Sequence, residues 1–180
     1  MNTIDSLIQK IKDNKSARLA LVLIFLRWAF TWTDTLLRYK LRRTPFVDPY
    51  VPIPKKNYYF YQLFFLIPYG IFLFFIECST AQLFLRLFKV KNDFREVMLY
   101  YATTALGLWP LFGPLDLLLV LKNKWASSLV IPYHTAAALV GGLSYSVGIR
   151  KMYHLSWPKS LLTGMMSMMV YRPLAVILIR

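Results

Sequence analysis

The 180-residue sequence is poor in the residues from which most metal centres are built. It contains one cysteine, Cys78, which excludes an internal disulfide and a cysteine-based metal site. It contains two histidines, and neither a second histidine nor an acid stands at ligand spacing from His134. The sequence therefore predicts no metal site and no bound cofactor.

Sequence motifs of enzymes are missing as well. There is no H-E-x-x-H zinc motif and no glycine-rich phosphate loop. The segment GLSYS at 142–146 begins like the nucleophile motif G-x-S-x-G but ends in serine, so the motif fails. We therefore predict no catalytic residues and expect that the protein is not an enzyme.

Acidic residues are scarce: eight aspartates and glutamates stand against 22 lysines and arginines, a net charge of +14. Such an excess could indicate nucleic-acid binding. Here, however, the cations cluster at the ends of apolar runs, where they would meet phospholipid head groups. The sequence predicts anionic lipid head groups as partners and no nucleic acid.

Apolar residues are abundant, at 57% of the chain, with a mean hydropathy of +0.45. Residues 58–121 form two long apolar segments joined by a charged elbow, and each exceeds the roughly 20 helical residues that cross a bilayer. The same pattern along the chain predicts an all-α fold, a multi-pass transmembrane helical bundle. Its five spans are expected at about 17–37, 58–83, 97–121, 125–149 and 160–179.

Residues 1–16 precede the first span and form a separate region. Ile4, Leu7, Ile8 and Ile11 repeat with helical spacing, and charged residues take the other positions. We expect an amphipathic helix that lies on the bilayer surface or packs on its own protein. Residues 17–180 make up the bundle.

Charged residues inside the spans are the candidate functional residues. Burying a charge in a bilayer costs several kcal/mol unless it is paired or hydrated. Arg27 and Asp34 are two helical turns, about 10 Å, apart, so each needs a partner on another helix or water. Glu77 is either an interhelical hydrogen-bond partner or part of an ion path. The predicted intramembrane polar network consists of Arg27, Asp34, Glu77, Asp116 and Arg172.

Prolines and small residues predict local features of the helices. Pro110 and Pro114 predict an interruption of the third span, and broken spans beside a charge are found at transporter binding sites; the alternative is a kinked structural helix. Asp93 is expected to cap this span, with Glu96 completing a capping box. In the fourth span, small residues predict close helix packing. They are Ala137, Ala138, Gly141, Gly142 and Ser146.

Five spans place the two chain ends on opposite sides of the membrane. Lysines and arginines that flank the spans are slightly more numerous on the side of the N-terminus. By the positive-inside rule, we expect the N-terminus in the cytoplasm.

Residues 58–180 resemble the Yip-domain family of five-span membrane proteins. The similar segments are RLFKVKNDFREVMLYYATTALGLWPL at 86–111 and GIRKMYHLSWPKSLLTG at 148–164, with His154 and Ser160 where the family usually has glycine and alanine. Eukaryotic members contact Rab-type GTPases and carry a long hydrophilic N-terminal region. Because residues 1–16 are short by comparison, the resemblance implies a prokaryotic-type member in a bacterial or archaeal cytoplasmic membrane.

Two functions remain open at this point. The first is an interaction or accessory protein that binds another membrane component, as a subunit of a transport or trafficking assembly or as a homo-oligomer. The alternative is a small transporter or channel subunit that uses the intramembrane charges.

Overall fold

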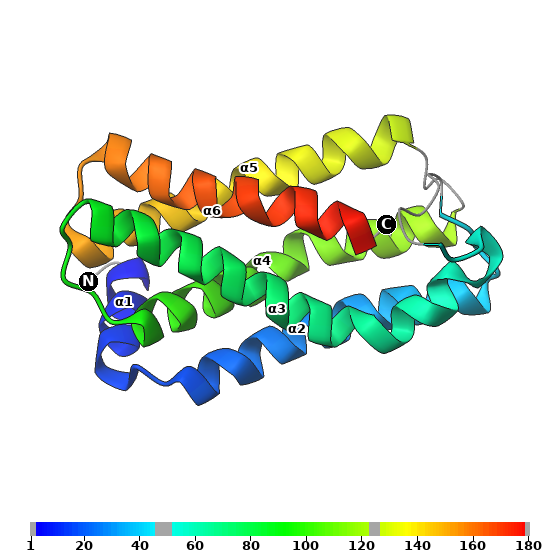
Figure 1. Ribbon diagram of the computed structural model, residues 1–180, viewed down its shortest axis with the longest axis horizontal. Coiled ribbons are helices and arrows are strands. Elements are labelled where there is room, and N and C mark those ends of the chain that lie inside the picture. The colour runs from blue at the N-terminus through cyan, green and yellow to red at the C-terminus, as the bar shows by residue number, and fades with distance from the viewer. Residues whose placement is uncertain (1–2, 46–51, 123–126, 179–180) are drawn as a thin grey trace.

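The computed structural model describes residues 3–45, 52–122 and 127–178. Across these residues the regular structure is helical, without strands (Figure 1). The helices are α1 (Thr3–Asn14), α2 (Ala17–Lys40), the short 3-10 helix η1 (Lys55–Asn57), α3 (Tyr58–Leu87), α4 (Phe94–Leu121), α5 (Ser127–Tyr153) and α6 (Trp157–Leu178). The all-α prediction is confirmed for this part of the chain.

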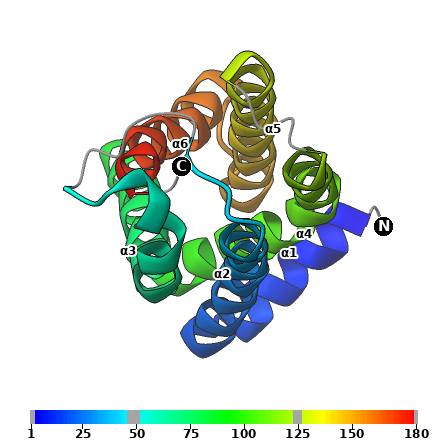
Figure 2. The same cartoon turned by 90° about the vertical axis from the view of Figure 1, so that its right-hand side faces the viewer.

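The five long helices form a ring. Viewed along the bundle, α2, α4, α5, α6 and α3 follow one another around its centre (Figure 2). The pairs α2–α3, α2–α4, α3–α6 and α5–α6 pack extensively, whereas α4 and α5 touch over a much smaller area. The ring therefore has one loose seam, between α4 and α5.

Among the described residues, three helical segments are long and apolar enough to cross a membrane. They are Ala17–Lys40, Lys55–Leu87 and Phe94–Leu121. Each exceeds the roughly 20 residues that the hydrocarbon core requires. These three segments indicate a membrane protein.

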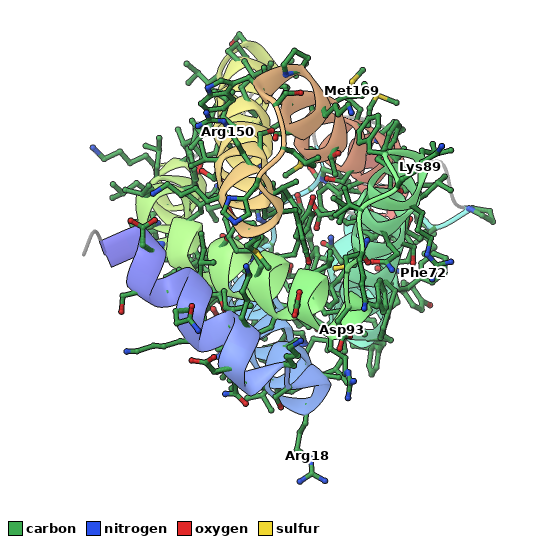
Figure 3. All side chains as sticks on the ribbon, turned by 90° about the vertical axis from the view of Figure 1, so that its left-hand side faces the viewer. Arg18, Phe72, Lys89, Asp93, Arg150 and Met169 are labelled. Atoms are coloured by element: carbon green, nitrogen blue, oxygen red, sulfur yellow. The ribbon has the colours of Figure 1, made fainter. Side chains whose placement is uncertain are left out.

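Cations and exposed apolar side chains are arranged as a bilayer would require. At the end of the bundle that Figure 3 faces, Arg18 points away from the protein, and Lys89 and Arg150 lie at the rim. Phe72 and Met169 point outward from α3 and α6, with 54% and 61% of their surface exposed. Water at the ends and lipid around the sides would accommodate both groups.

The predicted cap of α4 is confirmed, but the capping box is not. A carboxylate oxygen of Asp93 accepts a hydrogen bond from the backbone N–H of Arg95 at 2.9 Å. Glu96, which would complete the box, instead accepts from Lys15 at 2.7 Å and from the Tyr153 hydroxyl at 3.3 Å. The Glu96 carboxylate thus makes tertiary contacts and does not form the capping box.

Of the two alternatives at Pro110 and Pro114, the interruption is wrong and the structural helix holds, because α4 stays helical through both prolines. Both rings lie on the exposed surface of the helix, where they displace no packing partner. Between them, the Phe112 carbonyl accepts a hydrogen bond from the Tyr133 hydroxyl of α5. This bond joins α5 to the proline segment of α4.

The N-terminal helix packs on its own protein. Ile8 and Ile11 of α1 are buried as part of the main core, and α1 contacts α4 and α5. Two ion pairs of 2.7 Å fix its ends, Asp5 with Lys151 and Lys15 with Glu96. The hydrogen bond to the Glu96 carboxylate raises the pKa of Lys15 above its usual value, which stabilises the charged form of this lysine.

Close packing of α2 on α3 depends on a glycine. A Cβ atom at Gly70 of α3 would overlap with the ring of Trp28 of α2, which is 4% exposed. One turn further along, the Trp32 indole N–H donates to the Leu63 carbonyl at 2.9 Å. These contacts place the inner face of α2 toward the centre of the ring.

Candidate functional site

The ring of helices encloses a cavity of about 740 Å³. Helices α2, α3, α4, α5 and α6 all contribute to its wall. Apolar and aromatic side chains make up most of the lining, and a small number of charged groups interrupts it. A largely apolar pocket with few polar groups is typical of binding sites for small molecules.

The cavity brings together four of the five residues predicted as an intramembrane network. Arg27 and Asp34 face it from α2, Glu77 from α3 and Asp116 from α4. The fifth, Arg172, belongs to α6, and its side chain lies outside the described residues. The sequence thus identified charges that converge on one space from three different helices.

The prediction that Asp34 takes its partner from another helix is wrong. Its carboxylate accepts from the guanidinium Nε of Arg38 at 2.8 Å, one turn further along α2. The expected span ended at residue 37, so Arg38 fell in the connection and was missed. The i,i+4 spacing of an acid and an arginine was the signal that could have found it.

Arg38 is held inside the bundle although it is charged. It is 4% exposed, lines the cavity, and its guanidinium lies 5.7 Å from the centre of the Tyr59 ring. Contact with an aromatic face and with a carboxylate lowers the cost of burying this charge. Asp34 and Arg38 together form a neutral pair in the wall.

Arg27 also finds its neighbours on its own helix. One of its guanidinium nitrogens donates to the hydroxyl of Thr31, and the group lies 5.6 Å from the centre of the Trp28 ring. Both of these contacts lie on its own helix, and the expected partner on another helix or in water stays a prediction. Residues four apart on α2 face each other along the helix surface.

Asp116 is less well provided with partners. Its Oδ1 atom is buried and has no hydrogen-bond donor among the described residues. The Nε2 atom of His134 lies 4.0 Å away, beyond hydrogen-bonding distance. The Nδ1 atom of His134 is 2.9 Å from the Val130 carbonyl, which can only accept, so Nδ1 carries the hydrogen. A neutral His134 therefore has a lone pair on Nε2, facing Asp116.

Aromatic rings surround this end of the cavity. Trp109, Phe112 and Asp116 line it from one face of α4, at helical spacings of three and four. The ring of Phe30 stacks on Trp109 with the centroids 4.3 Å apart, and the ring of Tyr133 meets Phe112 edge to face at 6.0 Å. Asp116 is thus a carboxylate in an aromatic setting.

Glu77 is the most deeply buried acid of the group, with 4% of its surface exposed. It lies on α3 and contributes to the cavity wall. Its burial agrees with the predicted position well inside the second apolar segment.

The predicted small-residue face of α5 serves two purposes. Ala137, Ala138 and Gly141 line the cavity, where their short side chains leave space. Gly142 and Ser146 instead meet α6: both are buried, and a Cβ atom at Gly164 of α6 would lie within 2.7 Å of their backbone atoms. Gly141 serves both purposes, since a Cβ atom there would also lie 2.8 Å from the Met168 side chain of α6. Close packing is therefore found at Gly141, Gly142 and Ser146.

The chain was compared with protein families, curated proteins and solved structures. No family model, no curated protein and no solved structure matches this chain.

Proposed function

We propose that the chain is a five-span integral membrane protein in which α2 to α6 all cross the bilayer. The extensive packing of α5 on α6 and of α6 on α3 supports this arrangement, because it closes the ring around the three apolar segments. A five-span topology agrees with the resemblance to Yip-domain proteins. The flanking cations favour an N-terminus in the cytoplasm, with α1 beside the lipid head groups, and the resemblance favours a bacterial or archaeal cell.

We propose that the protein binds a small solute in its cavity and acts as a transporter or channel subunit. The observation that carries this proposal is the 740 Å³ cavity with charges from three helices at its wall. This volume falls in the range of about 300–1,000 Å³ that small-molecule sites occupy. Charged residues are costly inside a membrane and mark solute or ion pathways in other proteins.

The loose seam of the ring offers a place where the cavity could open. Near the cavity, α4 and α5 meet through the Tyr133–Phe112 contact and the His134–Asp116 approach. The two prolines of α4 lie in the same stretch and lack the N–H groups that would hold the helix straight. Movement of this half of α4 away from α5 would disturb few contacts.

The test is flux in liposomes that contain the purified protein and a panel of small cations, anions, zwitterions and neutral solutes. Replacement of the cavity acids, as Glu77→Gln and Asp116→Asn, is expected to abolish flux. Asp13→Asn changes an exposed acid on α1 and is the matched control that keeps it. If the wild-type protein neither transports nor binds any solute of the panel, this function is wrong.

An interaction or accessory role is the second candidate. A row of leucines on the outer face of α4 favours it: Leu111, Leu115 and Leu118 are 44–66% exposed and repeat at helical spacing. Other faces suited to a partner, on α1 and on α5, are already used inside the bundle. Purification from native membranes in mild detergent, followed by mass spectrometry, tests for a stoichiometric membrane-protein partner or a homo-oligomer. A monomer without a partner would contradict this role.

A further inference from the structure

We infer that the cavity takes an organic cation with an aromatic or apolar body, and that Asp116 is its counter-ion. This inference rests on the proposed function, since it names the class of solute that the same cavity accepts. It concerns a monovalent ammonium, phosphonium or guanidinium centre attached to hydrophobic groups.

The two guanidinium groups of the described lining residues have close partners other than Asp116. Among the described lining residues, three carboxylates face two guanidinium groups. Asp34 is neutralised by Arg38 at 2.8 Å, and the guanidinium of Arg27 is turned to Thr31 and the Trp28 ring. A carboxylate that pairs with neither guanidinium favours a cation over an anion beside it in this low-dielectric space.

Asp116 is the acid at which that cation fits. One of its buried oxygen atoms accepts no hydrogen bond from any side chain or backbone group in the described part of the chain. The nearest basic group, His134, is 4.0 Å away and in its neutral form presents a lone pair. A cationic ligand would supply a partner for this oxygen atom.

The surroundings of Asp116 favour an organic cation over a metal ion. Within the described ranges, no three His, Cys, Asp or Glu side chains converge closely enough to hold a metal. Trp109 and Phe112 instead present aromatic surface two turns and one turn before the carboxylate, respectively. Aromatic faces attract ammonium-type cations through their quadrupole and also bury apolar groups.

The test compares two ions of the same shape and opposite charge, tetraphenylphosphonium and tetraphenylborate. Binding to the purified wild-type protein in detergent is measured by equilibrium dialysis. We expect the phosphonium ion to bind at least ten-fold more tightly than the borate. This comparison requires no variant, so it does not depend on the folding of a mutant.

Variants then assign the selectivity to the carboxylate. Asp116→Asn keeps the shape of the side chain and is expected to weaken phosphonium binding at least ten-fold, with little effect on borate. Asp116→Glu retains the charge and is expected to retain the preference for the cation. Asp13→Asn, an exposed acid on α1, is the matched control and should leave both affinities unchanged.

Three outcomes would overturn the inference. The first is equal or tighter binding of the borate to the wild-type protein. The second is an Asp116→Asn variant that binds the phosphonium ion like the wild type. The third is binding of an anion or neutral solute from the flux panel without binding of any organic cation; in that case the cavity still binds solutes, and only the proposed solute class fails. If no solute of any class binds, the proposed function fails as well.

Discussion

The two halves of α4 differ in how deeply their residues are buried. In the first half, all seven residues from 96 to 102 are buried. In the following stretch from 103 to 119, which the structure describes completely, Gly113 alone is buried. One helix is thus part of a dense core at one end and the wall of a cavity at the other.

The two halves of α4 also differ in the hydrogen bonding of their buried polar groups. In the dense half, Tyr101 stacks on Tyr145 with ring centroids 4.0 Å apart, and its hydroxyl lies 3.0 Å from the Ser167 hydroxyl. In the cavity half, a carboxylate oxygen of Asp116 is buried without a donor among the described groups. An unsatisfied buried polar group costs about 1–3 kcal/mol. The difference indicates that the dense half supplies stability and that the cavity half retains groups that suit a ligand.

The largest effect is expected from adding a methyl group to a packed glycine. In Gly164→Ala, the new Cβ atom would lie 2.6 Å from the backbone nitrogen of Ser146 and 2.7 Å from the carbonyl oxygen of Gly142. Backbone atoms cannot yield without separating α5 from α6, so we expect a loss of about 1–3 kcal/mol in the free energy of unfolding. Thermal unfolding in detergent measures it.

The matched control for this substitution lies in the cavity half of α4. A Cβ atom at Gly107 would meet no described atom within 4 Å. Gly107→Ala is therefore expected to leave stability unchanged or to raise it by up to about 1 kcal/mol, because alanine favours helix. Equal destabilisation by the two substitutions would contradict the contrast between the halves.

A smaller effect is expected from removing one hydroxyl group that bonds within or beside each half of α4. Tyr101→Phe deletes the buried bond to Ser167 and should lower stability by about 1 kcal/mol. Tyr133→Phe deletes the bond to the Phe112 carbonyl, but Tyr133 is only half-buried and the carbonyl remains near the open cavity. We expect a smaller loss there, measured by the same unfolding experiment; a larger loss for Tyr133→Phe would reverse the comparison.

The smallest effect concerns pH at the first turn of α4. Hydrogen bonds from the side chain and backbone N–H of Arg95 hold the pKa of Asp93 below its usual value of 3.8. A depressed pKa in the folded state means that the carboxylate contributes stability above pH 3.8 and loses it as the pH falls through the lower folded pKa. Because the group is near the surface, the loss should be roughly 0.5 kcal/mol.

Amide hydrogen exchange in the first turn of α4 measures this contribution as the pH is lowered. Asp93→Asn retains a capping oxygen without a titrating proton, so it should remove the pH dependence of protection. A wild-type first turn that keeps full protection well below pH 3.8 would show that the Asp93 carboxylate does not stabilise this end of the helix.

Several features could be predicted because they depend on neighbours along the chain. The helices follow from the lengths of the apolar runs, and the cap at Asp93 follows from its place before a helix. Arg27, Asp34, Glu77 and Asp116 were identified by their charge alone, since a charge in an apolar run requires a polar environment. That environment is the cavity.

Other features could not be predicted because they depend on which helices become neighbours. The ion pair between Lys15 and Glu96 and the packing of Trp28 against Gly70 join residues far apart in the sequence. Whether α4 is interrupted or continuous at Pro110 and Pro114 also stayed open, because the local effect of a proline is the same in both cases.

The sequence by itself determined that the chain is helical, that long segments are apolar enough for a membrane, and that a few charges lie inside them. These properties are local, because hydropathy and helical periodicity act over a few turns. Only the tertiary structure decided that the helices close into a ring, that α1 packs on the bundle, and that the charges meet at one cavity. The order of helices around a ring is set by contacts between distant residues, and hydropathy carries no information about those contacts.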